Sequence, residues 1–431
     1  MKSLKQVLGG DPRQYTMLGA LVALLLVFQF ASGGRMLTSS NFQNLLAGNS
    51  YVLILAIGMV MVIVIGQIDL SVGSVAGLVG MVMALAAANW GVPWWVALLI
   101  GLATGVLIGC WDGFWVAQVG IPGFITTLAG LLMFRGIVIW ISGSISVPVP
   151  DEFRTLGSGY LPEWGPGFTL MNNSTLVLGL AAIAWVVWSQ LRKWSRLGKP
   201  GERPPLWPVV VRVVLISLVI AYLTWIFGSG RPGTSFPIPG LILVALIIIY
   251  TIITQRTVFG RHIYAVGGNR AAAALSGVNT KRVTFVVMAN MSFLAAVAGI
   301  LFVGRATSAG PADGTAWELD AIAAVFIGGA AVAGGVGTVT ASIVGGLVMA
   351  VLNSGLALTG VGADRTAVIK GLVLLIAVAF DVYSKGSGGR VSLTSRLFPK
   401  REEKALQDSG AGGLASSATS AEGSSTPSSS S

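Results

Sequence analysis

Long apolar segments follow one another along most of this chain, and each is long enough to cross a lipid bilayer. The hydrocarbon core of a bilayer is about 30 Å thick, so a spanning helix needs about 20 mostly apolar residues. Such segments recur between residues 17 and 380. Hydrophobic residues make up 54% of the 431 residues and charged residues 10%, which is more apolar surface than one soluble core could bury. The sequence therefore predicts an integral membrane protein.

The apolar segments predict helices rather than a barrel, because apolar and polar residues do not alternate within them. We expect an all-α, polytopic membrane bundle of about 12 spanning helices. The predicted spans are residues 17–30, 49–65, 70–88, 94–118, 122–141, 175–191, 207–227, 237–254, 283–303, 321–333, 338–358 and 367–382. An even number of spans places both termini on the same side of the membrane.

The basic residues predict the orientation, because cytoplasmic loops carry an excess of Lys and Arg. The connections 192–205 and 255–282 are basic, while the connection 142–173 has more acidic than basic residues, so we expect it outside. Both termini should be cytoplasmic. Residues 1–16 should form the N-terminus ahead of a retained first helix, and residues 383–431 a largely disordered Ser-rich tail.

The other function classes fit the composition less well. The net charge of +11 lies in short loops rather than in a stripe interleaved with aromatic residues, so we expect no nucleic-acid partner. The sequence has one cysteine, Cys110, and one histidine, His262, so it offers few nucleophiles or metal ligands. We therefore expect no catalytic or metal site. A Ser-Lys or paired-Asp enzyme site stays open as an alternative. A G-x-x-x-x-G-K-[ST] loop is absent, so we expect no ATP bound by that route.

Polar residues interrupt several apolar segments. Polar groups at membrane depth are costly and usually mark a transport pathway or a paired network. We expect that role for Gln67, Asp69, Ser71, Asp112 and Arg135. Two alternatives remain: Asp69 could cap the next helix from a cytoplasmic turn, and the other charged groups could form structural ion pairs.

Glycine spacing gives two further predictions. A second Gly-interrupted stretch at 328–346 matches the one at 66–77, and such paired interruptions are typical of a transport route. Gly101, Gly105, Gly109 and Gly113 recur every four residues and form a flat helix face. For this face we favour close packing within the bundle over a subunit interface.

The basic loop 255–282 contains the most informative stretch, GRHIYAVGGNRAAAALSGVNTKR. Asn269 is placed to cap a short helix over 270–276, and Gly277 is placed to end it. A polar helical loop between two spans is suited to docking a soluble partner. A solvated connector is the alternative.

Five separated segments, in the same order, resemble those of ribose-, xylose- and galactose-type permeases of ATP-binding-cassette sugar importers. They are GQIDLSVGS, VGIPGFITTLAG followed by FRG, GRHIYAVGGNRAAAALSGV, AWELDAIAAVFIGGAAVAGGVGTV and IKGLVLLIAVAFDV. The resemblance spans 49–382 and implies a permease domain at 17–382 in a bacterial inner membrane. It also implies a second permease copy forming a homodimer, two ATPase subunits that hold ATP and Mg, an external sugar-binding protein and a monosaccharide substrate.

The resemblance further implies that the loop 255–282 couples the permease to the ATPase. The residues that match the family's coupling segment are Gly267, Gly268, Asn269, Arg270, Leu275, Ser276 and Gly277. Ala271 stands where the family commonly has Glu, and Asp112 where it usually has Asn. An added stretch at 175–235 is similar to that of the longer xylose-type permeases. The alternative function is an ion-driven secondary transporter.

Overall fold

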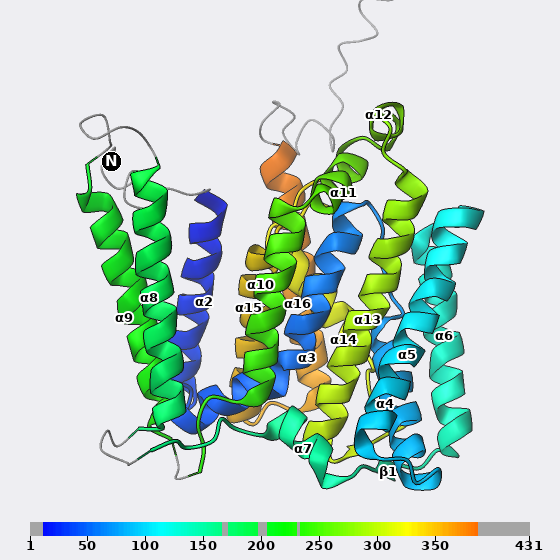
Figure 1. Cartoon of the computed structure of the whole chain (residues 1–431), viewed down its shortest axis with the longest axis horizontal. Coiled ribbons are helices and arrows are strands. Elements are labelled where there is room, and N and C mark those ends of the chain that lie inside the picture. Colours follow the sequence, from blue (N-terminus) through cyan, green and yellow to red (C-terminus); the bar gives the residue numbers. More distant parts are fainter. Residues whose placement is uncertain (1–11, 166–170, 197–204, 231–232, 387–431) are drawn as a thin grey trace, which may run out of the picture. The chain divides into compact units, whose positions relative to one another are not determined.

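The computed structural model describes residues 12–165, 171–196, 205–230 and 233–386 (Figure 1). The chain divides into two units, Met1–Val378 and Ala379–Ser431, and the described part of the second is the end of the last helix. Most of the predicted cytoplasmic N-terminus and Ser-rich tail, as well as Lys199 and Arg203 of the first basic loop, lie outside the described residues. The side of the membrane on which the termini lie stays a prediction.

Apolar helices make up the described part of the bundle, as predicted. Within the described residues, nine helices are long and apolar enough to span a membrane. They are α3 (Ser39–Val64), α4 (Val72–Asn89), α5 (Trp94–Gly113) continued by the π-helical η1 (Phe114–Val119), α6 (Gly123–Ser142), α8 (Asn173–Ser195), α9 (Trp207–Gly228), α10 (Ile238–Arg256), α13 (Thr280–Ala306) and α15 (Val339–Leu358). The first and last predicted spans correspond to α2 (Pro12–Ala31) and α16 (Ala363–Gly386).

The predicted span at 321–333 is wrong as a continuous spanning helix. The helix found there, α14 (Trp317–Ile327), has 11 residues. Its length is about 16 Å, roughly half the thickness of the hydrocarbon core. Residues 328–338 are not helical, and Gly329, Gly334 and Gly335 have positive φ angles there. Hydropathy alone did not separate a half-length helix followed by an apolar loop from a full span.

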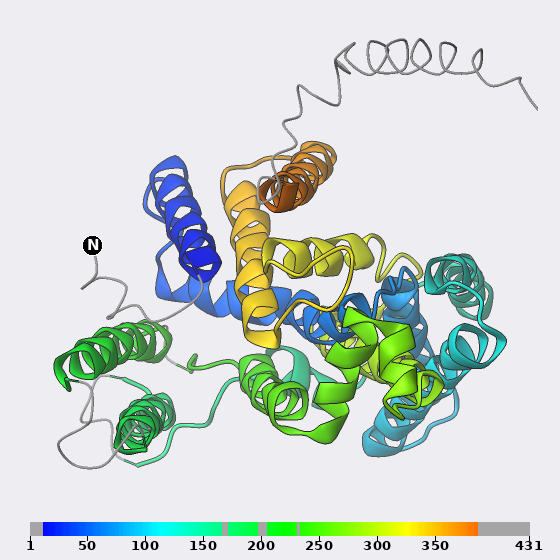
Figure 2. The same cartoon turned by 90° about the horizontal axis from the view of Figure 1, so that it is seen from above.

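The centre of the bundle is formed by α3, α4 and α13. Of the most apolar window in each helix, 89% of α3, 72% of α4 and 67% of α13 is buried, against 11% of α8 and 6% of α9. The spanning helices α3, α4 and α5 all pack against α13. Figures 1 and 2 show α8 and α9 side by side at the edge of the bundle. An apolar face left exposed by the protein suits contact with lipid.

The glycine face of α5 packs against α13. This supports close packing within the bundle rather than a subunit interface. A Cβ atom on Gly105 would lie 3.0 Å from the carbonyl oxygen of Ser292, and one on Gly109 would lie 2.6 Å from that of Ala289. The two helices therefore approach at backbone contact, as small residues allow in membranes.

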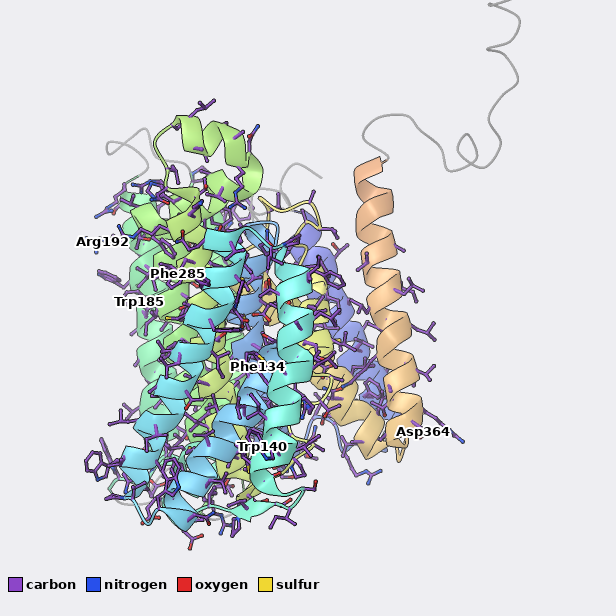
Figure 3. The ribbon with its side chains drawn as sticks, turned by 90° about the vertical axis from the view of Figure 1, so that its right-hand side faces the viewer. Phe134, Trp140, Trp185, Arg192, Phe285 and Asp364 are labelled. Carbon is purple, nitrogen blue, oxygen red and sulfur yellow. The ribbon has the colours of Figure 1, made fainter. Side chains whose placement is uncertain are left out.

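The two ends of the bundle carry different short elements. At one end lie α7 (Asp151–Ser158) and the strands β1 (Val147–Pro148) and β2 (Ser308–Ala309), which pair antiparallel. At the other end lie α11 (Val258–Gly268) and α12 (Arg270–Leu275) (Figure 1). Figure 3 shows Trp140 toward the first end and Arg192 toward the second. The described part of the acidic connection 142–173 and the basic loop 255–282 thus lie at opposite ends, as the charge pattern predicts.

Substituting Gly109 with Val should destabilise the fold, because the new side chain would overlap the backbone of α13. Overpacking of this kind costs about 1–3 kcal/mol. The matched control is Gly136→Val on α6, where a Cβ atom meets nothing within 4 Å. Thermal unfolding of the purified proteins in detergent measures the difference, and equal midpoints for the two variants would contradict the packing described here.

Candidate functional site

The first group of predicted site residues lies in the break between α3 and α4. Residues 65–71 are not helical and run alongside α6. The Gln67 side-chain oxygen accepts a 2.8 Å hydrogen bond from the N–H of Gly123, at the start of α6. One turn further along α6, the Thr127 hydroxyl accepts a 3.0 Å bond from the N–H of Leu70. Side chains of this segment and of α6 thus replace hydrogen bonds that a continuous helix would supply.

Asp69 is buried within this break, with no exposed surface. Its Oδ1 atom accepts hydrogen bonds from the N–H of Ser71 at 2.8 Å and from the Ser71 hydroxyl at 2.7 Å. This is a local turn that leads directly into α4. The turn lies inside the bundle, so Asp69 does not cap α4 from a solvated loop.

Asp112 on α5 is brought to the same place from 41 residues further along the chain. Its Oδ2 atom lies 3.5 Å from the Ser71 hydroxyl, and the residue is fully buried. Asp69 Oδ2 and Asp112 Oδ1 have no hydrogen-bond partner among the described residues, and neither residue forms an ion pair there. Two carboxyl groups therefore share one hydroxyl in an apolar interior.

Arg135 on α6 has a different set of partners from the two aspartates. Its Nη1 atom donates to the backbone oxygens of Asp313 at 2.6 Å and Pro311 at 3.3 Å. These carbonyls belong to the non-helical stretch before α14. The arginine thus stabilises the approach to the half-length helix, and no hydrogen bond or ion pair joins it to Asp69 or Asp112 among the described residues.

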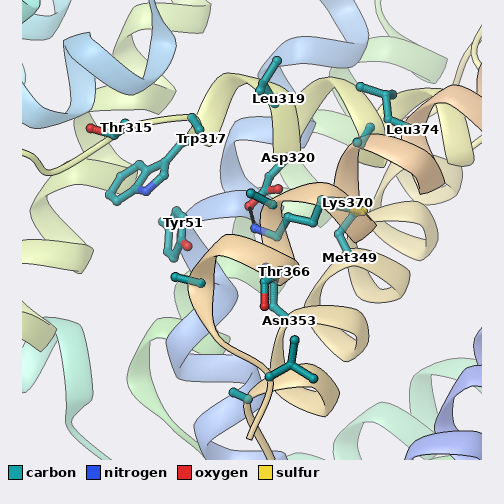
Figure 4. Close-up of a pocket in the computed structure, with 17 residues that line it drawn as sticks. Tyr51, Thr315, Trp317, Leu319, Asp320, Met349, Asn353, Thr366, Lys370 and Leu374 are labelled. Carbon is teal, nitrogen blue, oxygen red and sulfur yellow. Dashed lines mark hydrogen bonds and ion pairs between the residues drawn. The ribbon is translucent and has the colours of Figure 1, made fainter. Parts of the chain in front are cut away.

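A cavity of about 520 Å³ lies between α3, α14, α15 and α16 (Figure 4). Asp320 of α14 and Lys370 of α16 form an ion pair across it at 2.9 Å, with 6% and 27% of their side chains exposed. Neither residue is among the site residues predicted from the sequence. The sequence places one charged residue inside each of two apolar segments. That these two residues pair, 50 positions apart, depends on the tertiary fold and could not be read from either segment.

The cavity also has an aromatic wall. The rings of Tyr51 and Trp317 lie 4.1 Å apart between centroids, and Phe302 braces Trp317 edge-on at 4.6 Å. On α15, the Asn353 side-chain nitrogen donates to the side-chain oxygen of Asn49 at 3.3 Å. The Asn353 side-chain oxygen is buried without a hydrogen-bond partner among the described residues.

The predicted coupling residues lie at the end of α11, in α12 and directly after α12. The Asn269 side-chain oxygen accepts a 2.9 Å bond from the N–H of Ala272 and so caps α12, as predicted. Gly277 has a φ angle of +84°, which ends the helix as predicted. Arg270, Leu275 and Ser276 lie on its exposed surface, and Leu275 is 91% exposed.

One hydrogen bond joins α11 to the stretch after α14, and a second joins that stretch to the end of α3. The Tyr264 hydroxyl donates to the carbonyl of Gly337 at 2.7 Å. The N–H of Gly335 donates to the carbonyl of Val64, the last residue of α3, at 2.8 Å. A Cβ atom on Gly267 would overlap that same carbonyl, whereas Gly268 next to it has open space. The loop elements therefore pack directly on the ends of α3 and on the stretch after α14.

A helical bundle with interrupted helices and polar groups at membrane depth is typical of a membrane transport protein. The family described as branched-chain amino acid transport system / permease component matches residues 41–378. The chain belongs to this family, which makes it a multi-pass membrane permease component and not an enzyme.

Individual relatives match over most of their length. The chain is 37% identical over 308 residues to the xylose transport system permease protein XylH of Haemophilus influenzae, covering 71% of this chain and 79% of that protein. The XylH protein of Escherichia coli K12 is also 37% identical, over 76% of its length. The ribose import permease protein RbsC of the same strain is 33% identical over 307 residues, or 74% of its length. No solved structure matches the chain significantly.

The buried carboxyl pair predicts unequal effects of two substitutions. Asp69→Ala removes the acceptor of both Ser71 hydrogen bonds and should lower the free energy of unfolding by about 1–3 kcal/mol. Asp112→Asn keeps the side-chain shape and removes one of two neighbouring buried carboxyl groups, so it should be at least as stable as the wild type. Thermal unfolding in detergent measures both. A larger loss for Asp112→Asn than for Asp69→Ala would refute this account of the pair.

Proposed function

We propose that the chain is the membrane-spanning permease subunit of an ATP-binding-cassette importer in the bacterial inner membrane. Its substrate would be a monosaccharide, xylose or a related sugar. The observation that carries the substrate class is the 37% identity to two xylose permeases over 308 residues, and the ribose permease supports it. The family description names branched-chain amino acids, so leucine is the comparison substrate.

The energy for transport would come from partner subunits. Two ATPase subunits would hold ATP and Mg, and this chain would bind no cofactor. Their contact would be α12 with its exposed Leu275. The other proposed partners are a second permease copy, giving a homodimer, and an external sugar-binding protein that delivers the substrate.

The contacts around α11 support a route by which the ATPase would act on the membrane helices. A displacement of α12 would be passed to α11, because the two helices are adjacent in the chain and in contact. From α11, the Tyr264–Gly337 hydrogen bond leads to the stretch that joins α14 to α15. The N-terminal end of α14 carries Trp317 and Asp320, which line the cavity. Nucleotide binding would shift the bundle only if these contacts differ between its two states.

The rival function is an ion-driven secondary transporter. The observation that favours it is the pair Asp69 and Asp112, two buried carboxyl groups without an ion-pair partner among the described residues. Carboxyl groups at membrane depth are typical of proton and sodium pathways.

Reconstituted vesicles separate the two functions. The chain together with its ATPase and binding protein should accumulate radiolabelled D-xylose only when ATP is present, and L-leucine should not be accumulated. Uptake of xylose by the isolated chain under a proton or sodium gradient would instead establish the rival function. Accumulation of leucine but not of xylose would reverse the substrate assignment.

Bulky substitutions in the exposed part of the coupling loop test the docking contact. Gly268→Trp and Ser276→Trp should insert normally, since both positions have open surroundings, yet should lower sugar-stimulated ATP hydrolysis at least about tenfold by obstructing the contact. Arg192→Trp, at the same end of the bundle on α8, is the control and should retain stimulation. Normal stimulation in both loop variants would remove the support for docking at α12.

A further inference from the structure

The cavity between α3, α14, α15 and α16 combines two kinds of surface that a sugar requires. Hydrogen-bonding groups are supplied by Asp320 and Lys370, paired at 2.9 Å, and by the hydroxyl of Thr366. Flat apolar surface is supplied by Tyr51 and Trp317, and Figure 4 shows these side chains around one space. A sugar has hydroxyl groups on its rim and C–H groups on its ring faces, so it can use both surfaces together.

The charge of the cavity favours a neutral ligand. Asp320 and Lys370 neutralise each other within the lining, so neither charge calls for a counter-ion on the ligand. Hydroxyl groups can donate to the carboxylate and accept from the ammonium without breaking the pair. An amino acid, in contrast, brings two charges that would compete with the pair.

The position of the cavity also fits passage of a substrate. It lies at the N-terminal end of the half-length helix α14, and transporter substrate sites are typically formed at such discontinuous helices. Its lining continues to Val361, in the connection between α15 and α16, and to Ala363 at the start of α16. Figure 3 places the neighbouring Asp364 at the end of the bundle opposite α12. In the proposed orientation this is the side from which sugar arrives.

The volume is adequate for one small molecule. Ligand pockets typically enclose about 300–1,000 Å³, and this cavity measures about 520 Å³.

We propose that this cavity is a transient binding site for one monosaccharide on its way through the permease. In it, Asp320, Lys370 and Thr366 bond the hydroxyl groups of the sugar, while Tyr51 and Trp317 pack against its C–H surface. The proposal rests on the proposed sugar-transport function and adds the residues that contact the substrate.

Filling the cavity is the first test. Gly371 lines it, and a Cβ atom there meets nothing within 4 Å, so Gly371→Phe can be introduced without a backbone clash. In vesicles that contain the complete importer, this variant should take up D-xylose about tenfold more slowly than the wild type or worse. Gly136→Phe on α6, also in open space but away from the cavity, is the matched control and should transport normally. Equal uptake by the two variants would overturn the proposal.

Protection of a cysteine from labelling is the second test and needs no transport. Cys110 is the only cysteine of the chain, so Cys110→Ala gives a cysteine-free background. Thr366→Cys in this background should react with a small thiol reagent, and D-xylose at millimolar concentration should slow the reaction, whereas L-leucine should not. Asp364→Cys, two residues earlier on α16 and outside the cavity lining, is the control and should react at the same rate with or without sugar.

The two tests distinguish failure of the site from failure of the proposed function. If the wild-type importer takes up no xylose but xylose protects Thr366→Cys, the site stands and the transport assignment fails. If the importer takes up xylose and Thr366→Cys is not protected, the site is refuted and the transport function stands. Should Gly371→Phe unfold at a lower temperature than Gly136→Phe, the labelling result decides the proposal.

Discussion

Every interruption of a helix inside a bilayer must find new partners for backbone N–H and C=O groups, because lipid offers none. The described bundle has two such interruptions. The first is residues 65–71, and the second is formed by the two stretches on either side of α14, residues 307–316 and 328–338. Thr127 bonds the backbone of the first, and Arg135 bonds carbonyls before α14. Tyr264 bonds a carbonyl after α14. The polar side chains at membrane depth are therefore needed for the fold itself, whatever part they take in transport.

The same constraint brings the two interruptions together. The carbonyl of Val64, left open where α3 ends, accepts the N–H of Gly335 from the stretch after α14. Gly335 has a φ angle of +74° and lies against Gly267 and Gly268, positions where backbones meet without side chains between them. The loop outside the bundle and the broken helices inside it thus share one small contact region. Because this region is closely packed, a displacement of the loop should also displace the ends of the broken helices.

Local patterns in the sequence predicted most of the helices and the details of the coupling loop. Apolar length located eleven of the predicted spans, and the side-chain chemistry of Asn269 with the glycine after α12 predicted both ends of that short helix. The half-length helix α14 was missed because its apolar composition continues into the glycine-rich stretch that follows. The pairing of Asp69 with Asp112 and of Asp320 with Lys370 joins residues far apart in sequence, so no local pattern could reveal it.

The helices α8 and α9 correspond to the added stretch at 175–235 and form a hairpin that closes on itself. The N–H of Asn172, just before α8, donates to the carbonyl of Gly228 at the end of α9 at 3.0 Å, so the chain enters and leaves the hairpin at one place. Thr224 packs against Gly179 inside it, and its main link to the rest of the bundle is the contact of Phe227 with Gln43 and Phe42 on α3. A closed hairpin of this kind can be gained or lost in evolution as one piece, without rethreading the helices around it.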